Sequence, residues 1–143
     1  HSNVKFGTLT GSEAGLTNAV NNALADAGMT IDDIDAVFGF ANGMKAVDDV
    51  EIKGLTAVFG DKLTEKPVVE LKEVLGESRA AAATTAAAHA ALMFAGKIPS
   101  QEAYSIAADG SVSKTNVEAS KLNNILVAAY GAGGSYTAIV LSK

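Results

Sequence analysis

The sequence contains no cysteine and only two histidines, His1 and His89, among its 143 residues. The absence of cysteine excludes disulfide bonds, thiolate metal sites and a cysteine nucleophile within this chain. Two histidines are too few for a histidine-rich metal site. We therefore expect no metal site of these kinds, and we expect no other cofactor.

Basic residues are also scarce, because 11 lysines and arginines face 16 aspartates and glutamates, which gives a net charge of −5. Nucleic acids bind to basic surfaces, so we expect no nucleic-acid partner. The same charge argues against binding to an anionic membrane surface. The sequence shows neither a signal peptide nor a convincing membrane span, and we expect a cytoplasmic protein.

Alanine, in contrast, is concentrated in one stretch. Ten of the sixteen residues at 80–95 are alanine, the residue with the highest helix propensity. Ser78 can cap the start of a helix, and Gly96 and Pro99 supply stop signals. The stretch has no polar face, which predicts a helix that is buried on all sides.

A transmembrane helix is the alternative for this stretch, because its length is close to the minimum for a span. Alanine and threonine contribute little transfer free energy, however, and Thr84, Thr85 and His89 lie in the middle. Small side chains instead allow a sheet or a second helix to approach the backbone closely. We therefore expect this helix in a middle layer of a stacked α/β protein.

The remaining sequence alternates between helical and strand patterns. Apolar residues at helical spacing predict a helix over 16–24, closed by Gly28, and a second helix over 45–59. Strands are predicted at 34–40, 67–71, 124–129 and 135–141, with loops at 72–77 and over most of 100–116, where 103–107 is a possible strand. Residues 4–9 could form a strand or an extended arm. The order predicts one α/β domain with a mixed sheet over 13–143, after an N-terminal arm or expression remnant at 1–12.

The glycines Gly131, Gly133 and Gly134, which follow Tyr130, have two interpretations. They could hold a phosphate, but a phosphate loop leads from a strand into a helix, and this segment leads into a strand. A hairpin turn is therefore favoured.

Acidic side chains give three further candidates. Asp48 and Glu51 lie one helical turn apart and could face one pocket, although a solvated helix face is the commoner meaning. Glu77 lies just before the alanine helix, where the helix dipole favours a negative charge, and Lys72 lies five residues earlier. An ion pair between Lys72 and Glu77 is the plain interpretation, and a pocket is the alternative.

His89 has no carboxylate at helical spacing to orient it, so a core or partner-facing histidine is favoured over a catalytic base.

The order of these motifs from residue 13 to residue 141 resembles the C-terminal half of the β-ketoacyl synthases, the condensing enzymes of fatty acid and polyketide synthesis. The segment ALADAGMTIDDIDAV is similar to the family's segment before the first catalytic histidine. In FANGMKAVDDVEIKGLTAVFG, Phe40 takes the place of that histidine and Asn42 lies in the loop after it, while Asp48 and Glu51 match the family's acidic pair.

Two later motifs extend the resemblance. In KEVLGESRAAAATTAAAHAALMFAGKIP, Lys72 and Gly76 match the family, and Glu77 stands where the second catalytic histidine would be. NILVAAYGAGGSYTAIVL is similar to the family's last turn and strand, with Ala132 in place of a phenylalanine. The resemblance implies the C-terminal half of a thiolase-like fold: a mixed sheet, two outer helices, and the alanine helix on the inner face.

The departures from the family determine the function that the resemblance implies. The family uses a cysteine nucleophile from its N-terminal half and two histidines that support malonyl decarboxylation. This chain lacks all three groups, so we expect no condensing activity and a role similar to that of a chain-length factor. The implied partners are the N-terminal ketosynthase half, a second ketosynthase-fold subunit, or both, together with an acyl carrier protein. The alternatives are a fragment of an active synthase and a structural α/β interaction domain.

Overall fold

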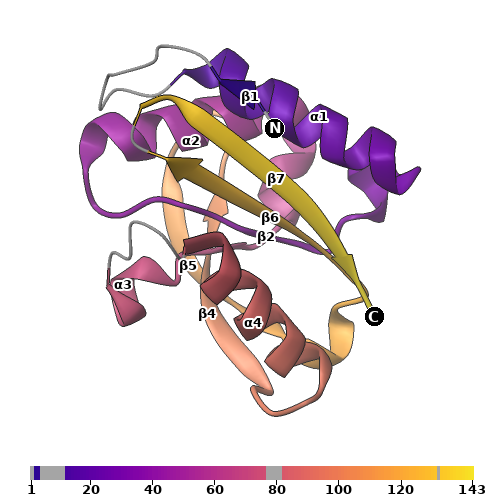
Figure 1. Cartoon of the computed structure of the whole chain (residues 1–143). Helices are drawn as coiled ribbons and strands as arrows, with labels where there is room; N and C mark the ends of the chain where they lie inside the picture. Colours follow the sequence, from indigo (N-terminus) through magenta and orange to yellow (C-terminus); the bar gives the residue numbers. More distant parts are fainter. Residues whose placement is uncertain (1, 4–11, 77–81, 132) are drawn as a thin grey trace.

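A seven-stranded mixed sheet forms the middle layer of the computed structural model, which describes residues 2–3, 12–76, 82–131 and 133–143 (Figure 1). The spatial order of the strands is β1-β7-β6-β2-β3-β4-β5. The strands are β1 (Ser2–Asn3), β2 (Ala36–Phe38), β3 (Val68–Val69), β4 (Ser100–Ile106), β5 (Val112–Glu118), β6 (Asn124–Gly131) and β7 (Ser135–Ser142). Strand β2 lies parallel to β3 and β6, whereas the other neighbours are antiparallel, so the predicted mixed sheet is confirmed.

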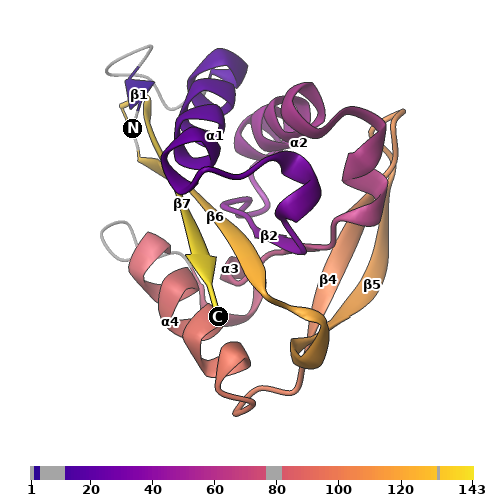
Figure 2. The same ribbon diagram turned by 90° about the vertical axis from the view of Figure 1, so that its right-hand side faces the viewer.

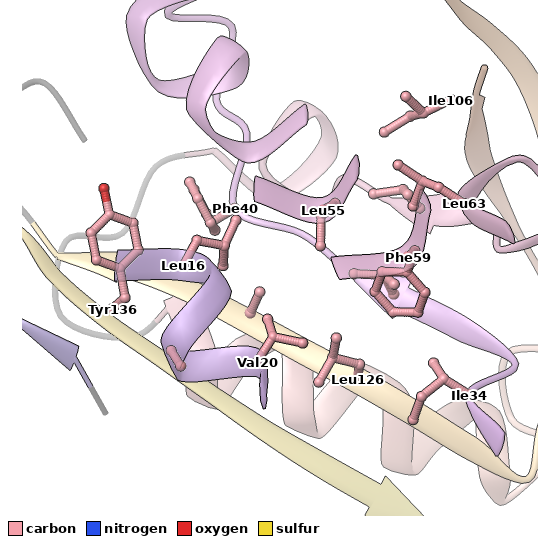
Figure 3. Packing of buried hydrophobic residues seen from close by; sticks show 14 of the residues in the cluster. Leu16, Val20, Ile34, Phe40, Leu55, Phe59, Leu63, Ile106, Leu126 and Tyr136 are labelled. Atoms are coloured by element: carbon pink, nitrogen blue, oxygen red, sulfur yellow. The ribbon is translucent and has the colours of Figure 1, made fainter. Parts of the chain in front are cut away.

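Helices α1 (Glu13–Ala27) and α2 (Lys45–Phe59) cover one face of the sheet, as the sequence predicts (Figure 1). Helix α1 begins at the N-cap Ser12 and ends at Gly28, whose φ of 66° is the left-handed conformation that glycine adopts without strain. The helices pack on each other through Gly54, which lies directly against Leu16. Their inward residues join the sheet in a core that includes Leu55 and Phe59 (Figure 3). Complete burial of such a side chain stabilises the fold by about 1.5–3 kcal/mol.

Helix α4 (Ala82–Phe94), the main part of the predicted alanine helix, lies on the opposite face of the sheet (Figure 2). Ala86, Ala90 and Met93 are buried against the sheet. The prediction of burial on all sides is wrong for this chain by itself, because the outward stripe of the helix is solvent-exposed. That stripe consists of Thr84, Ala88, Ala91 and Leu92. Composition indicates that a helix has no polar face, but it does not indicate which molecule covers it.

The predicted loop over most of 100–116 is also wrong, because this segment forms the antiparallel hairpin of β4 and β5. Only Ala103 and Ile106 on β4 and Val117 on β5 are buried. The strands lie at the edge of the sheet, where most side chains meet water, so their sequence is polar. The turn contains Asp109 and Gly110, a recognised hairpin signal, and Gly110 has a φ of 81°.

Smaller differences concern the ends of elements. Residues Lys72–Leu75, predicted as loop, form the single-turn helix α3, closed by Gly76 with a φ of 78°. The strand predicted at 34–40 is shortened to β2, which is buried on both faces as expected. The short 3₁₀ helices η1 (Ile31–Asp33), η2 (Gly60–Glu65) and η3 (Ala119–Lys121) complete the connections. The possible strand at 4–9 lies outside the described residues.

Candidate functional site

The loop that leaves the carboxyl end of β2 is held by two carboxylates of α2. The backbone N–H groups of Phe40 and Ala41 donate to Oε1 and Oε2 of Glu51, over 2.6 and 2.9 Å. The next N–H, that of Asn42, donates to Oδ1 of Asp48 over 3.0 Å. Hydrogen bonds from a backbone amide to a charged acceptor are stronger than those to a neutral one. The acidic pair of α2 therefore fixes three consecutive residues of this loop.

Glu51 is almost completely buried, with 2% of its surface exposed, so its placement on a solvated helix face is wrong. Burial disfavours the charged form and raises the pKa of Glu51 above its ordinary value, although hydrogen bonds from Glu70, Phe40 and Ala41 oppose this effect. The Glu70 carboxyl, just after β3, approaches the same point beside Gly39. Glu70 was not a candidate from sequence, because a single glutamate after a short apolar strand carries no recognised pattern.

Asp48 and Glu51 of α2 face one cavity, as the pocket alternative for these two residues predicts. The cavity has a volume of about 190 Å³ and lies between α2 and strands β3, β4 and β5. Its polar lining comes from Asp48, Glu51, Glu70 and Tyr104. Its apolar lining includes Ile52, Val68, Ile106 and Val112. Among the described residues, no group of three His, Cys, Asp or Glu side chains is arranged to hold a metal ion.

Phe40 does not point into this cavity. Its ring is buried with 1% exposure in the core under α1 and α2 (Figure 3). It lies 5.8 Å from the ring of Tyr130 and 6.3 Å from that of Tyr136, between ring centroids. These distances are typical of stabilising aromatic pairs. Phe40 therefore connects the loop after β2 to the β6–β7 hairpin by apolar contact.

Lys72 lines a smaller cavity of about 70 Å³ on the α4 side of the sheet. Gly39, Gly76 and Thr85 are among the other residues of its wall. The pocket alternative for Lys72 thus has a geometric basis. Glu77, the proposed ion-pair partner of Lys72, lies outside the described residues, so the ion pair stays a prediction.

The glycines after Tyr130 form the turn between β6 and β7, and Gly131 is paired with Ser135. Gly133 and Gly134 have φ values of 104° and 83°, and the N–H of Gly134 donates to the carbonyl of Gly131 over 3.2 Å. The hairpin interpretation is therefore confirmed over the phosphate loop. Ala132 lies outside the described residues.

Comparison with known proteins identifies the family. Residues 2–105 match the beta-ketoacyl synthase C-terminal domain. The chain belongs to the β-ketoacyl synthase C-terminal domain family. A protein of Streptomyces halstedii that bears the name polyketide beta-ketoacyl synthase 2 is 29% identical over 134 residues, which cover 92% of this chain and 32% of that protein. The chain thus spans about a third of the length of this relative.

Solved structures agree with the β-ketoacyl synthase assignment. The ishigamide ketosynthase/chain length factor superposes with a TM-score of 0.80 at 23% identity, over 99% of this chain and 36% of that chain. A type II polyketide synthase acyl-carrier protein in complex with its ketosynthase, bound to the hexaketide, gives a TM-score of 0.73 at 16% identity, over 99% and 36%. The fold is therefore the C-terminal half of the thiolase-like ketosynthase fold, as predicted.

His89 lies on α4 of this ketosynthase domain with its ring 5.9 Å from that of Phe38. Burial lowers the pKa of His89 below its ordinary value, and a hydrogen bond with Gln101 opposes the change. Among the described residues, none forms a hydrogen bond with Nε2 of His89. This arrangement supports a core histidine. None of the helices in the described ranges is long and apolar enough to cross a membrane.

Proposed function

We propose that this ketosynthase domain does not condense acyl chains and instead serves as a partner in polyketide or fatty acid assembly. The observation that carries the proposal is the burial of Phe40. The resemblance aligns Phe40 with the first catalytic histidine, and its ring is enclosed by aromatic and aliphatic side chains. It offers no hydrogen-bond donor to a reacting oxygen.

The chemistry of condensation supports the same proposal. In the family, a cysteine of the N-terminal half takes up the acyl group, so this step concerns a part of the fold that the present residues do not form. Two donors then stabilise the enolate oxygen that develops as the malonyl unit loses carbon dioxide. Loss of one such donor costs about 2.7–4 kcal/mol in the transition state. At the aligned positions, Phe40 has no donor, and the sequence has Glu77, which is normally anionic, instead of the second histidine.

The outward stripe of α4 supports a partner role. Leu92 in this stripe is 47% exposed, and none of the stripe's residues carries a formal charge. The helix packs against its own sheet through its opposite side only. We propose that the N-terminal ketosynthase half, a second ketosynthase-fold subunit, or both cover this stripe. The relatives include a ketosynthase/chain length factor and a complex with an acyl-carrier protein, which makes an acyl carrier protein a further candidate partner.

The test combines capture with a decarboxylation assay. The tagged chain is co-expressed with ketosynthase-fold proteins and an acyl carrier protein from its own genome, and the captured complex is given malonyl-loaded carrier protein. We expect a stoichiometric ketosynthase-fold partner and no carbon dioxide release that depends on this chain. Lys97, an exposed residue just after α4, provides the control. The proposal is wrong if Lys72→Ala lowers the release of carbon dioxide and Lys97→Ala does not.

A further inference from the structure

We propose that Asn42 is a site of spontaneous deamidation, and that its conversion to aspartate or isoaspartate loosens the loop after β2. The proposal rests on the pair Asn42 and Gly43, on the turn that these residues form, and on the carboxylates of α2 that anchor the loop. The reaction needs only water, so it is independent of whether the domain condenses acyl chains.

The sequence contains a single asparagine that is followed by glycine, at residues 42 and 43. Deamidation begins when the backbone nitrogen of the following residue attacks Cγ of the asparagine. A nitrogen–carbon bond forms, the proton of the attacking nitrogen passes through solvent to the leaving group, and the bond from Cγ to the side-chain nitrogen breaks. Ammonia departs and a cyclic succinimide remains, which water opens to aspartate or isoaspartate. Glycine favours the attack because it has no side chain to shield the nitrogen and its backbone rotates freely.

The turn holds the reacting groups of Asn42 and Gly43 close together. Oδ1 of Asn42 accepts a hydrogen from the N–H of Met44 over 3.1 Å, so the side-chain carbonyl is folded back over the chain that contains the nitrogen of Gly43. Negative charge develops on Oδ1 during the attack. A backbone N–H that already donates to this oxygen stabilises that charge. Gly43 is solvent-exposed, so water reaches the succinimide.

The anchors of the loop leave the ring free to close. The N–H groups of Ala41 and Asn42 are held by Glu51 and Asp48, whereas ring closure turns the peptide group that follows, between Asn42 and Gly43. Gly43 has a φ of 81°, which glycine adopts without strain. Apart from its chain neighbours, no described residue has a heavy atom within 4 Å of the position that a Cβ would occupy there. The segment that has to move therefore has both space and backbone freedom.

Asn123 provides an internal comparison. Like Asn42, it is a loop residue whose N–H donates to an aspartate, in this case to Oδ2 of Asp35 over 2.7 Å. The next residue is Asn124, whose side chain shields its backbone nitrogen. The N–H of Asn124 also donates to Oδ2 of Asp35, over 2.9 Å, and this bond has to break before the nitrogen attacks. Asn123 should therefore convert slowly in the same sample.

Conversion of Asn42 changes the loop in two ways. Aspartate places a carboxylate on the residue whose N–H binds Asp48, and like charges in one turn repel each other. Isoaspartate carries the main chain through Cβ and lengthens it between Ala41 and α2. Because Glu51 of α2 also holds the N–H of Ala41, the lengthened segment is fixed at both ends. The extra atom therefore strains these contacts and lowers stability.

Incubation of the purified 143-residue chain in mildly alkaline buffer tests the proposal. Cleavage after lysine places Asn42 in the peptide 6–45 and Asn123 in the peptide 122–143. Mass spectrometry with fragmentation then measures the replacement of –NH2 by –OH at each asparagine. We expect Asn42 to convert at least about tenfold faster than Asn123, a barrier difference of about 1.4 kcal/mol. A rate at Asn42 that is no higher than the rate at Asn123 overturns the proposal.

Gly43→Asn is the matched variant. Asparagine tolerates a positive φ better than most residues that have a side chain, and the variant copies the pair Asn123 and Asn124. We expect conversion of Asn42 to slow about tenfold in this variant. An unchanged rate in the folded variant overturns the proposal. The comparison within the wild-type chain needs no variant, so it stays conclusive if Gly43→Asn does not fold.

The effect on the loop is measured on the converted chain itself. Anion exchange separates this chain from the fresh protein, because conversion adds a negative charge. We expect the urea midpoint of the converted chain to shift downward, whereas the Gly43→Asn chain should have the same midpoint before and after incubation. Equal midpoints for converted and fresh wild-type chains would show that deamidation leaves the loop intact.

Discussion

Gly39 and Glu51 are in such close contact that a Cβ atom on Gly39 would lie 2.7 Å from Oε1 of the glutamate. The backbone just after β2 thus meets helix α2 where the Glu51 carboxylate packs against the Cα of Gly39, which has no side chain. Because Glu51 also binds the next two amides, a shift of its carboxyl group would affect the whole loop.

The first prediction follows from this contact. Gly39→Ala should lower the free energy of unfolding by about 1–3 kcal/mol, the usual cost of inserting a methyl group into a packed site. Urea denaturation of wild type and variant measures the difference. Gly131→Ala is the matched control, because the nearest atom to its new Cβ lies 3.5 Å away, an ordinary contact distance. Equal losses in the two variants would show that Gly39 is not a site of close packing.

The second prediction concerns Phe40. Phe40→His should lower the free energy of unfolding by about 2–4 kcal/mol, because it removes aromatic contacts and buries a polar ring among apolar groups. Phe40→Leu preserves an apolar side chain and should cost about 1 kcal/mol. Thermal or urea unfolding separates the two. Phe40→His alone should also bring no malonyl decarboxylation, and a clear gain of that activity would mean that the histidine can leave the core.

Several elements could be predicted from sequence because their signals are local. The bounds of α2 agree with the predicted helix at 45–59, since an apolar stripe and Gly60 mark it. The hairpin of β6 and β7 follows from strand patterns on both sides of a glycine-rich turn. The alanine content likewise gives α4 its helical form.

The missed features depend on contacts that leave no local pattern. Glu51 resembles a surface residue in sequence because its partners are backbone amides, which any residue supplies. Glu70 becomes part of the site only through the parallel pairing of β2 and β3 beside Gly39. Strands β4 and β5, at one end of the sheet, are polar because they are largely exposed, and only Asp109 and Gly110 signal the turn between them.

The third prediction is a pH dependence from His89. Burial lowers its pKa in the folded chain below the ordinary 6.5, so the unfolded chain binds the proton more readily. The stabilising contribution is therefore complete above pH 6.5 and is lost as the pH falls below it. His89→Gln should remove this part of the pH profile of urea unfolding. His1→Gln, which changes the chain's other histidine, should leave the profile as in wild type; a profile unchanged by His89→Gln would contradict the prediction.

The fourth prediction tests the outward stripe of α4 as the partner surface. Ala88 lies in the middle of this stripe, and Ala88→Glu would place a charge in the proposed interface. An unpaired buried charge costs about 3–5 kcal/mol, so the affinity for a ketosynthase-fold partner should fall about 100-fold or more. The isolated chain should change in stability by no more than about 0.5 kcal/mol, because Ala88 is solvent-exposed in it.

Ala25→Glu provides the control for this experiment, because Ala25 is an exposed alanine on α1, on the other face of the sheet. Affinity is measured by titrating the labelled chain with its captured partner, and stability by urea unfolding of each chain alone. Loss of affinity in Ala88→Glu but not in Ala25→Glu assigns the partner to the α4 face. If both variants bind like the wild type, the partner contacts another surface, and the exposed alanine stripe needs a different explanation.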